Sequence, residues 1–129
     1  MPAASQIRAL IVDDQSSIRS VLASHMSELG FTGVAQRKDG KEALEYLETN
    51  PTHLVISDFN MPEMDGLELL KAVRANPKTK KVAFIILTGE ANKDLVQKAV
   101  QAGVNNFLAK PYTVAKLREA IEKVFGHLR

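Results

Sequence analysis

The sequence predicts an α/β protein, a (βα)5 doubly wound fold in which five parallel strands alternate with five helices. Two patterns carry this prediction. Short apolar runs recur along the chain, and after each of them apolar residues return at the spacing of an amphipathic helix. Alternation of this kind is typical of a parallel sheet with helices on both faces. Residues 84–87 are uniformly apolar, as a strand buried on both faces requires.

Five segments are expected to form the strands, at residues 7–12, 34–35, 53–57, 82–87 and 106–109. The first helix is expected between the first two strands, where Ser16 or Ser17 would be its N-cap and Gly30 suits its end. Its apolar residues at helical spacing are Ile18, Val21, Leu22, Met26 and Leu29.

Capping residues mark the second and third helices. Asp39 and Asp65 are expected to cap them, because an aspartate side chain accepts a hydrogen bond from a free backbone N–H of the first turn. The pairs Asn50-Pro51 and Asn76-Pro77 are expected to end them. Their buried faces would carry Ala43, Leu44 and Leu47 in the second helix and Leu69, Leu70 and Val73 in the third.

The last two helices have similar signals. The fourth is expected over residues 93–102, with Gly103 as its stop. Thr113 is expected to cap the fifth, which would reach almost to Arg129. Their buried faces would carry Leu95, Val96 and Ala99 in the fourth helix and Val114, Leu117, Ile121 and Val124 in the fifth.

Length and composition indicate one domain over residues 7–128, with a short tail at residues 1–6 and no fused output domain. The chain has 129 residues, of which 45% are hydrophobic, so it can bury a full core. The net charge of +2 gives no reason to expect a nucleic-acid partner. The basic cluster at residues 78–81 is interpreted as a solvated loop.

Several classes of protein are excluded by what the sequence lacks. There is no cysteine, so disulfides and thiol chemistry are ruled out. No apolar stretch approaches the roughly 20 residues of a membrane span, and the first residues do not have the pattern of a signal peptide. The histidines, His25, His53 and His127, show no metal-ligand spacing and are assigned no role. We therefore expect a soluble cytoplasmic protein that binds no membrane. We also expect it to be a monomer.

Polar side chains close four of the predicted strands. Asp13 and Asp14 follow the first strand, Asp58 the third, Thr88 the fourth and Lys110 the fifth. Right-handed crossovers make the strands parallel, so their carboxyl ends share one edge, where ligands bind in open α/β sheets. The sequence therefore predicts one cleft that contains three carboxylates, a hydroxyl and an ammonium group.

This set of groups suits phosphoryl chemistry. Three carboxylates in one cleft repel one another, and a bound divalent cation relieves that repulsion. Mg²⁺ prefers oxygen ligands and leaves positions open for phosphate oxygens. Lys110 can neutralise a phosphoryl group, Thr88 can donate a hydrogen bond to it, and one carboxylate can act as a nucleophile toward phosphorus.

The motifs of this cleft resemble those of the receiver domains of two-component response regulators, and most closely the stand-alone chemotaxis type, the CheY family. The motifs are Asp13-Asp14, the run from Ser57 to Pro62, Met64-Asp65-Gly66, Leu87-Thr88-Gly89 and Lys110-Pro111. The resemblance covers residues 7–128. It implies the flavodoxin-like receiver fold with strand order 2-1-3-4-5. It also implies a regulator that catalyses only its own phosphorylation and dephosphorylation.

The resemblance implies a phosphoacceptor and a magnesium site. Asp58 would accept a phosphoryl group from a sensor histidine kinase or from a small donor such as acetyl phosphate. Asp14 and Asp58 would bind Mg²⁺ directly, Asp13 through a water molecule, and Asn60 through its backbone carbonyl. Asn60 and Glu90 occupy the positions that tune hydrolysis of the acyl phosphate in this family, and their identities imply a short-lived phosphorylated state.

The resemblance also implies a switch and an output face. Thr88 and Lys110 would bind the phosphoryl group, Phe107 would turn inward as the switch aromatic, and the Lys110-Pro111 bond is the expected cis peptide. The surface expected to contact a flagellar motor switch protein includes Glu90, Lys93, Val96, Tyr112 and Lys116. A phosphatase is a further expected partner.

Three alternative functions remain, and the sequence features that would distinguish two of them are known. Within the same family, the chain could be a phosphate sink or a phosphorelay intermediate that shares a kinase with another regulator. A phosphatase of the haloacid dehalogenase type would need its two acidic residues two positions apart, whereas Asp13 and Asp14 are adjacent. A flavin-binding protein would need a phosphate loop rich in glycine and hydroxyl residues after the first strand, and the acidic pair there repels phosphate.

Overall fold

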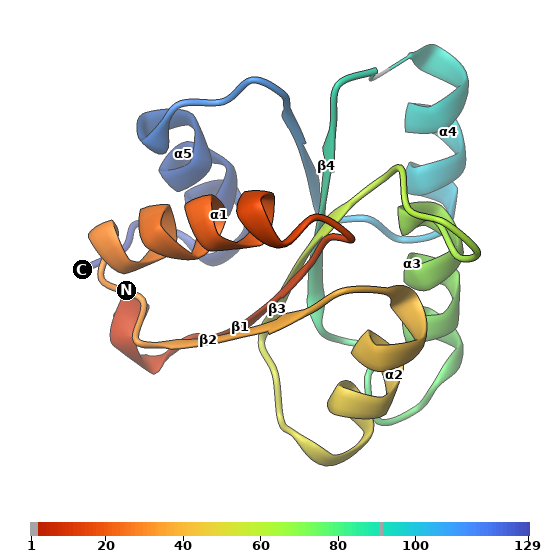
Figure 1. The fold of residues 1–129 in the computed structure, drawn as a ribbon, viewed down its shortest axis with the longest axis horizontal. Coiled ribbons are helices and arrows are strands. Elements are labelled where there is room, and N and C mark those ends of the chain that lie inside the picture. The colour runs from red at the N-terminus through yellow and green to blue at the C-terminus, as the bar shows by residue number, and fades with distance from the viewer. Residues whose placement is uncertain (1–2, 91) are drawn as a thin grey trace.

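The computed structural model describes residues 3–90 and 92–129 and contains a five-stranded parallel sheet between two layers of helices (Figure 1). The strand order β2-β1-β3-β4-β5 confirms the predicted fold. The strands are β1 (Arg8–Val12), β2 (Gly33–Arg37), β3 (Leu54–Asp58), β4 (Ala83–Thr88) and β5 (Asn106–Ala109). The helices are α1 (Ser16–Glu28), α2 (Gly40–Thr49), α3 (Gly66–Ala75), α4 (Lys93–Gln101) and α5 (Val114–Phe125).

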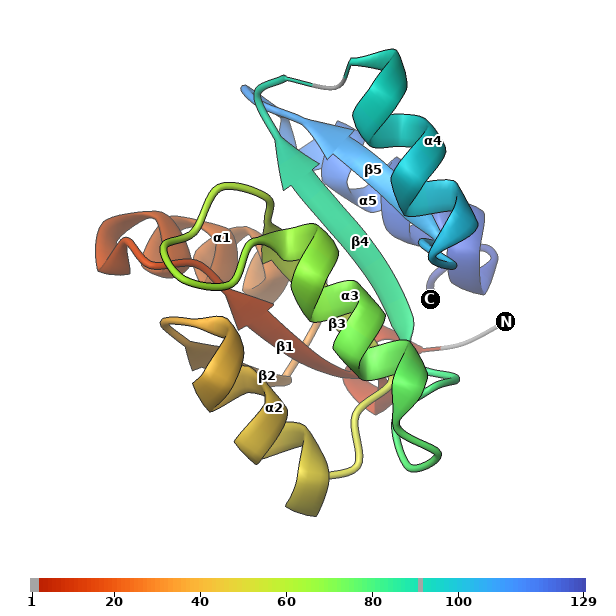
Figure 2. The same ribbon diagram turned by 90° about the vertical axis from the view of Figure 1, so that its right-hand side faces the viewer.

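Helices cover both faces of the sheet, with α1 and α5 on one face and α2, α3 and α4 on the other (Figures 1 and 2). Side chains alternate along the inner strands. In β4, Ile85 and Leu87 join the core cluster under α1 and α5, whereas Phe84 and Ile86 join the cluster under the other three helices. Burying one such side chain stabilises the fold by about 1.5–3 kcal/mol. In the described part of the chain, no helix is long and apolar enough to span a membrane.

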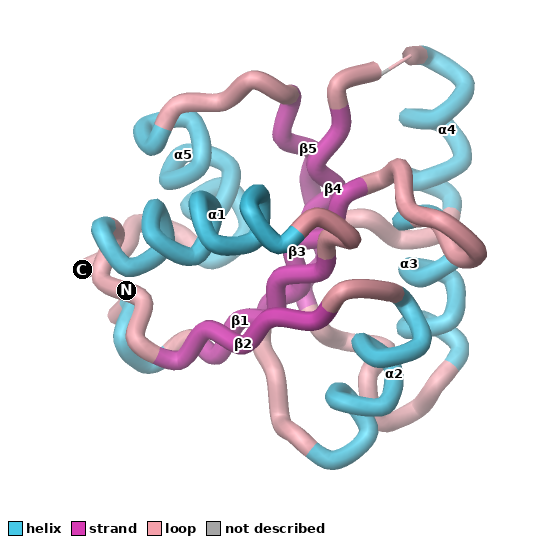
Figure 3. The backbone as a smooth tube through the Cα atoms, in the orientation of Figure 1, coloured by secondary structure: helices cyan, strands magenta, loops and turns pink. Residues whose placement is uncertain are grey.

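Loops connect each strand to the helix that follows it, as Figure 3 shows. Three of the predicted caps are confirmed, since Asp39, Asp65 and Thr113 each accept a hydrogen bond from a backbone N–H three residues later. The cap predicted for α1 is wrong. Gln15 occupies the N-cap position and its side chain makes no capping hydrogen bond, so Ser16 is the first helical residue.

The ends of the elements differ from the prediction in detail. The stops of α1 and α4 are confirmed, because Gly30 and Gly103 adopt positive φ angles of 98° and 92°. The fifth helix was predicted to run almost to the end of the chain, but it stops at Phe125, because Gly126 follows it with a φ of 87°. Val21, one of the apolar residues at helical spacing in α1, is 52% exposed.

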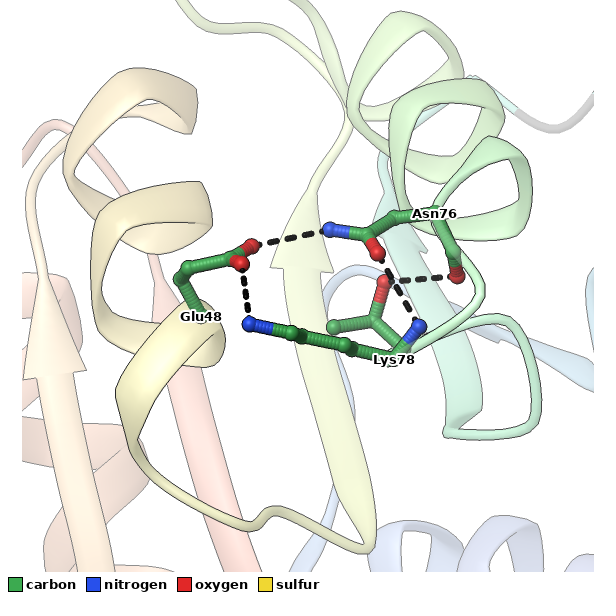
Figure 4. Close-up of polar contacts among 4 residues, drawn as sticks. Glu48, Asn76 and Lys78 are labelled. Atoms are coloured by element: carbon green, nitrogen blue, oxygen red, sulfur yellow. Dashed lines mark hydrogen bonds and ion pairs between the residues drawn. The ribbon is translucent and has the colours of Figure 1, made fainter.

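The edge of the sheet at the amino ends of the strands is braced by polar contacts (Figure 4). The carboxylate of Glu48 in α2 accepts hydrogen bonds from Asn76 Nδ2 at 2.9 Å and from Lys78 Nζ at 2.8 Å. The hydroxyl of Thr79 is buried and donates to the carbonyl oxygen of Val73 at 2.7 Å. The basic cluster predicted to be a solvated loop therefore has exposed lysines, but Thr79 anchors it to α3.

Candidate functional site

Three carboxylates converge at the carboxyl edge of the sheet. Asp13 and Asp14 follow β1, and Asp58 is the last residue of the neighbouring strand β3. One carboxylate oxygen from each lies within 4.8 Å of the other two. The predicted clustering of these side chains is therefore present in the structure. Oxygen atoms at this spacing suit a hard divalent cation.

Asp13 is the buried member of the acidic cluster, with 2% of its surface exposed. Its Oδ1 atom accepts a hydrogen bond from the Gln15 N–H at 2.9 Å, whereas its Oδ2 atom is the buried side-chain oxygen without a partner among the described residues. Burial raises the pKa of Asp13, and the carboxylates of Asp58 and Asp14 add to the increase against the opposing effects of the Gln15 N–H and Lys110. An unpaired buried oxygen in a residue of a carboxylate cluster is the feature that a cation would relieve.

Asp58 is buried and paired with a cation from the edge strand of the sheet. Its Oδ1 atom lies 2.6 Å from Lys110 Nζ, an ion pair whose lysine side chain is 30% exposed. The backbone holds Lys110 in place, because its N–H donates to the carbonyl oxygen of Thr88 at 2.9 Å. The bond between Lys110 and Pro111 is cis. The acidic cluster thus has one ammonium group as its counter-charge.

Thr88 ends β4 beside Asp58 and is buried, with 1% of its surface exposed. Its hydroxyl oxygen accepts a hydrogen bond from the Glu90 N–H at 3.0 Å. Glu90 and Asn60 are both exposed at the mouth of the cleft. No described residue donates a hydrogen bond to the backbone carbonyl of Asn60. The cleft is therefore buried at its base and open at its rim.

The loop between β3 and α3 is held tightly against the cleft. Gly66 begins α3, and a Cβ atom on it would lie 2.7 Å from the backbone oxygen of Asp58. The Gly66 N–H donates to the carbonyl oxygen of Phe59 at 2.8 Å, and the Ser57 hydroxyl donates to the Asp58 oxygen at 2.9 Å. The backbone of Asp58 is thus fixed from two sides. In the same loop, Glu63 has a φ of 69°, which is strained for a residue with a side chain.

The remaining predicted residues lie on both sides of the sheet. Phe107 in β5 is half-buried and packs against the core cluster under α2, α3 and α4. Tyr112 is half-buried and packs against the other cluster, beside α1. Val96 is half-buried and was expected to face inward, whereas Lys93 and Lys116 are exposed. The two aromatic residues that flank Lys110 therefore contact opposite layers of helices.

Two contacts near the cleft carry no signal in the sequence. The Arg19 guanidinium, from α1, donates a hydrogen bond to the backbone oxygen of Asp13. The imidazole of His25, also in α1, makes a hydrogen bond with the Tyr112 hydroxyl at 2.9 Å. The three histidines were assigned no role and none joins the acidic cluster of the described residues, but His25 does have this structural contact.

The comparisons with known proteins agree with this geometry. Residues 9–122 match the family model described as a response regulator receiver domain. The chain is 51% identical, over the whole of both chains, to a probable chemotaxis protein CheY of Rhizobium etli. The solved structure of the Vibrio cholerae chemotaxis protein CheY4 is similar, with a TM-score of 0.86 and 32% identity over 92% of this chain and 98% of that one.

A further similar structure holds a metal. It is the receiver domain of a sensor histidine kinase from Pseudomonas aeruginosa, which has a magnesium ion coordinated in its active site cleft. That structure has a TM-score of 0.83 and 28% identity over 93% of this chain and 98% of that one.

Proposed function

Because this chain belongs to the receiver domain family of two-component response regulators, we propose that it is a phosphorylation-activated signalling protein whose phosphoacceptor is Asp58. The observation that carries the proposal is the ion pair between Asp58 and Lys110 at 2.6 Å, inside a cluster of three carboxylates. A nucleophilic carboxylate beside a fixed ammonium group and a cation site is what phosphoryl transfer requires.

The acidic cluster fits Mg²⁺. The unpaired Oδ2 atom of Asp13 and the three oxygens within 4.8 Å of one another support a cation with oxygen ligands. Asp14 and Asp58 would hold the ion directly, Asp13 would hold it through water, and Asn60 would offer its free backbone carbonyl. Bound there, the ion supplies positive charge against the oxygens of the phosphoryl group.

In the proposed reaction, a carboxylate oxygen of Asp58 attacks the phosphorus of a phosphohistidine on a sensor kinase. The new O–P bond forms as the P–N bond breaks, and the electron pair leaves with the imidazole nitrogen. Lys110 forms an ion pair with the Asp58 carboxylate before the reaction, and it would bind a phosphoryl oxygen after it. The hydroxyl of Thr88 donates to another phosphoryl oxygen.

Loss of the phosphoryl group is the return step. Water attacks the acyl phosphate, the O–P bond breaks, and inorganic phosphate leaves the Asp58 carboxylate. Asn60 and Glu90 stand exposed at the rim and would tune the approach of this water. We therefore propose a short-lived phosphorylated state, with a phosphatase as a further partner. The protein turns over no external substrate and works as a signalling protein.

The phosphorylated protein would bind its partner through the face formed by α4, β5 and α5. The phosphoryl group adds roughly −1.5 to −2 charge, and Thr88 and Phe107 would relay the change to this face. The contact residues would be Glu90, Lys93, Val96 and Lys116, whereas Tyr112, which was also expected on this face, packs beside α1. The similarity to a chemotaxis protein over the whole chain supports a role in chemotaxis, and the proposed partner is a flagellar motor switch protein. The protein would act as a monomer in the cytoplasm. Phosphorylation and partner binding would then strengthen each other by the same factor.

Intact-mass spectrometry tests the phosphoacceptor. The wild type is incubated with acetyl phosphate with and without Mg²⁺, beside Asp58→Asn and the control Asp94→Asn, an exposed carboxylate of α4. We expect the wild type and the control to gain one phosphoryl mass only with Mg²⁺, and Asp58→Asn to gain none. No gain in the wild type, together with no binding of beryllofluoride, would contradict the proposal.

A further inference from the structure

Helix α1 is tied to the segment between β5 and α5 by one pair of side chains. The Tyr112 hydroxyl and the Nδ1 atom of His25 are hydrogen-bonded at 2.9 Å, although 87 residues separate them. The two rings meet edge to face, with centroids 5.5 Å apart and an interplanar angle of 87°. Both side chains are half-buried. This pair therefore combines a hydrogen bond with a ring contact.

Little else holds the segment against α1. Among the described residues, this is the hydrogen bond that joins α1 to residues 110–113. An open pocket of about 530 Å³ is lined by the pair itself, by Ile18 and Val21 of α1 and by Lys110 and Pro111 of the segment. Ile18 and Val21 of α1 therefore line an open pocket next to the segment. Among the described residues, the His25–Tyr112 pair is therefore the polar contact that ties the segment to α1, while the Lys110 N–H bonds the segment to β4.

Lys110 is held at both ends of its short segment. Its own N–H is bound to the carbonyl oxygen of Thr88 at 2.9 Å, and Tyr112 fixes the chain two residues later. Its ammonium group reaches Asp58 at 2.6 Å at the end of a flexible side chain. Fixing the backbone on both sides reduces the conformations that the ammonium group must give up when it binds a phosphoryl oxygen.

We propose that His25 and Tyr112 are positioning residues, which hold Lys110 in the place where it binds the phosphoryl group. The inference rests on the proposed function of the cleft. The hydrogen bond between the two side chains forms whether the imidazole is neutral or charged, because a tyrosine hydroxyl both donates and accepts. The pair therefore acts as a permanent brace of the site.

A double-mutant cycle tests the brace, with Tyr112→Phe, His25→Phe and the combined variant. Tyr112→Phe removes only the hydroxyl and leaves the ring packed against the core cluster. The probe is beryllofluoride with Mg²⁺, an analogue of the phosphoryl group, and the measured quantity is its half-saturating concentration. The control is Tyr46→Phe, the same chemical change at a half-buried tyrosine whose hydroxyl makes no hydrogen bond among the described residues.

We expect each single variant to raise the half-saturating concentration about threefold to tenfold, the range that one hydrogen bond supports. The combined variant should raise it no further, since both changes remove one interaction. Tyr46→Phe should match the wild type. In NMR spectra of the lysine ammonium groups, the Lys110 signal should broaden in the two single variants and remain unchanged in the control.

Two outcomes overturn the inference and can be told apart. If the variants bind beryllofluoride at the wild-type concentration, even with a lower melting temperature, the pair stabilises the fold without positioning Lys110. If the wild type binds no beryllofluoride, or Asp58→Asn binds it equally well, the proposed function fails and the inference fails with it.

Discussion

The buried carboxylate of Asp13 should cost the metal-free protein stability, so we expect Asp13→Asn to be more stable than the wild type without Mg²⁺. The amide oxygen of asparagine can still accept the hydrogen bond from the Gln15 N–H. The charge and the unpaired Oδ2 atom disappear. The amide NH₂ that replaces Oδ2 can donate to a neighbouring carboxylate. The substitution therefore keeps the local turn and removes the repulsion.

The magnitude follows from the spacing of the cluster. Two unit charges 4.8 Å apart repel by about 3.5 kcal/mol at an effective dielectric constant of about 20. Attraction to Lys110 cancels part of this repulsion, and Asp14 is exposed and adds little. We expect the free energy of unfolding of Asp13→Asn to exceed that of the wild type by about 1–3 kcal/mol at pH 7.

Urea unfolding followed by circular dichroism measures this difference, since the chain has no tryptophan for fluorescence. The pKa of Asp13 is raised by burial above its ordinary value of 3.8, so the folded state binds this proton more tightly than the unfolded state. The loss of stability that the charged Asp13 carboxylate causes is therefore complete above the raised pKa, and it disappears as the pH falls toward 3.8. The difference in the free energy of unfolding between Asp13→Asn and the wild type should therefore become smaller as the pH is lowered across that range.

Added Mg²⁺ should also shrink the difference, because the wild type gains more binding energy from the ion than the variant. Asp14→Asn is the matched control, a carboxylate of the same cluster that is exposed, and its gain without Mg²⁺ should be smaller. A variant less stable than the wild type in EDTA at pH 7 would refute the reasoning, since it would show that Asp13 is not a source of repulsion.

Three further predictions can be checked in the same unfolding assay, two of them with a matched control substitution. Gly66→Ala should lower the free energy of unfolding by about 1–3 kcal/mol, because its Cβ would lie 2.7 Å from a backbone oxygen. Gly89→Ala, where a Cβ meets nothing within 4 Å, should change it by less than about 0.5 kcal/mol, and equal effects at the two glycines would disprove the steric argument. Glu63→Gly should raise it by about 0.5–1 kcal/mol by removing the strain of a φ of 69°, and a loss would mean that the side chain has a stabilising contact. Arg74→Met should lower it by about 2 kcal/mol or more, because this guanidinium donates to carbonyl oxygens of two loops, while the exposed Lys71→Met on the same helix should be neutral.

The sequence was sufficient to predict the caps of three helices, which are local interactions. The caps of α2, α3 and α5 were predicted because each involves a side chain and a backbone N–H three residues away. The cap predicted for α1 was wrong. Asp13 accepts a hydrogen bond from the Gln15 N–H in the turn before the helix, and residue preferences do not show how this bond sets the start of the helix. The exposure of Val21 was not predictable, because Val21 lines a pocket together with residues 110–112, which are distant in the sequence.

The candidate site was predictable to the extent that topology determines it. Parallel strands bring their carboxyl ends to one edge, so Asp13, Asp58 and Lys110 could be placed together without coordinates. The different environments of the carboxylate oxygens could not be predicted, because they depend on which oxygen accepts a hydrogen bond. The His25–Tyr112 pair had no signal either, since nothing local connects residues so far apart.

The two ends of the described chain meet at the braced edge of the sheet, where the Ala4 N–H donates to the carbonyl oxygen of Arg129 at 3.4 Å (Figure 1). The groups of the cleft come from separate strand ends on the opposite edge. The covalent order of the segments is therefore not what holds the cleft together. A circular permutant, with the old ends joined by a short linker and new ends opened at the braced edge, would keep every strand end in place.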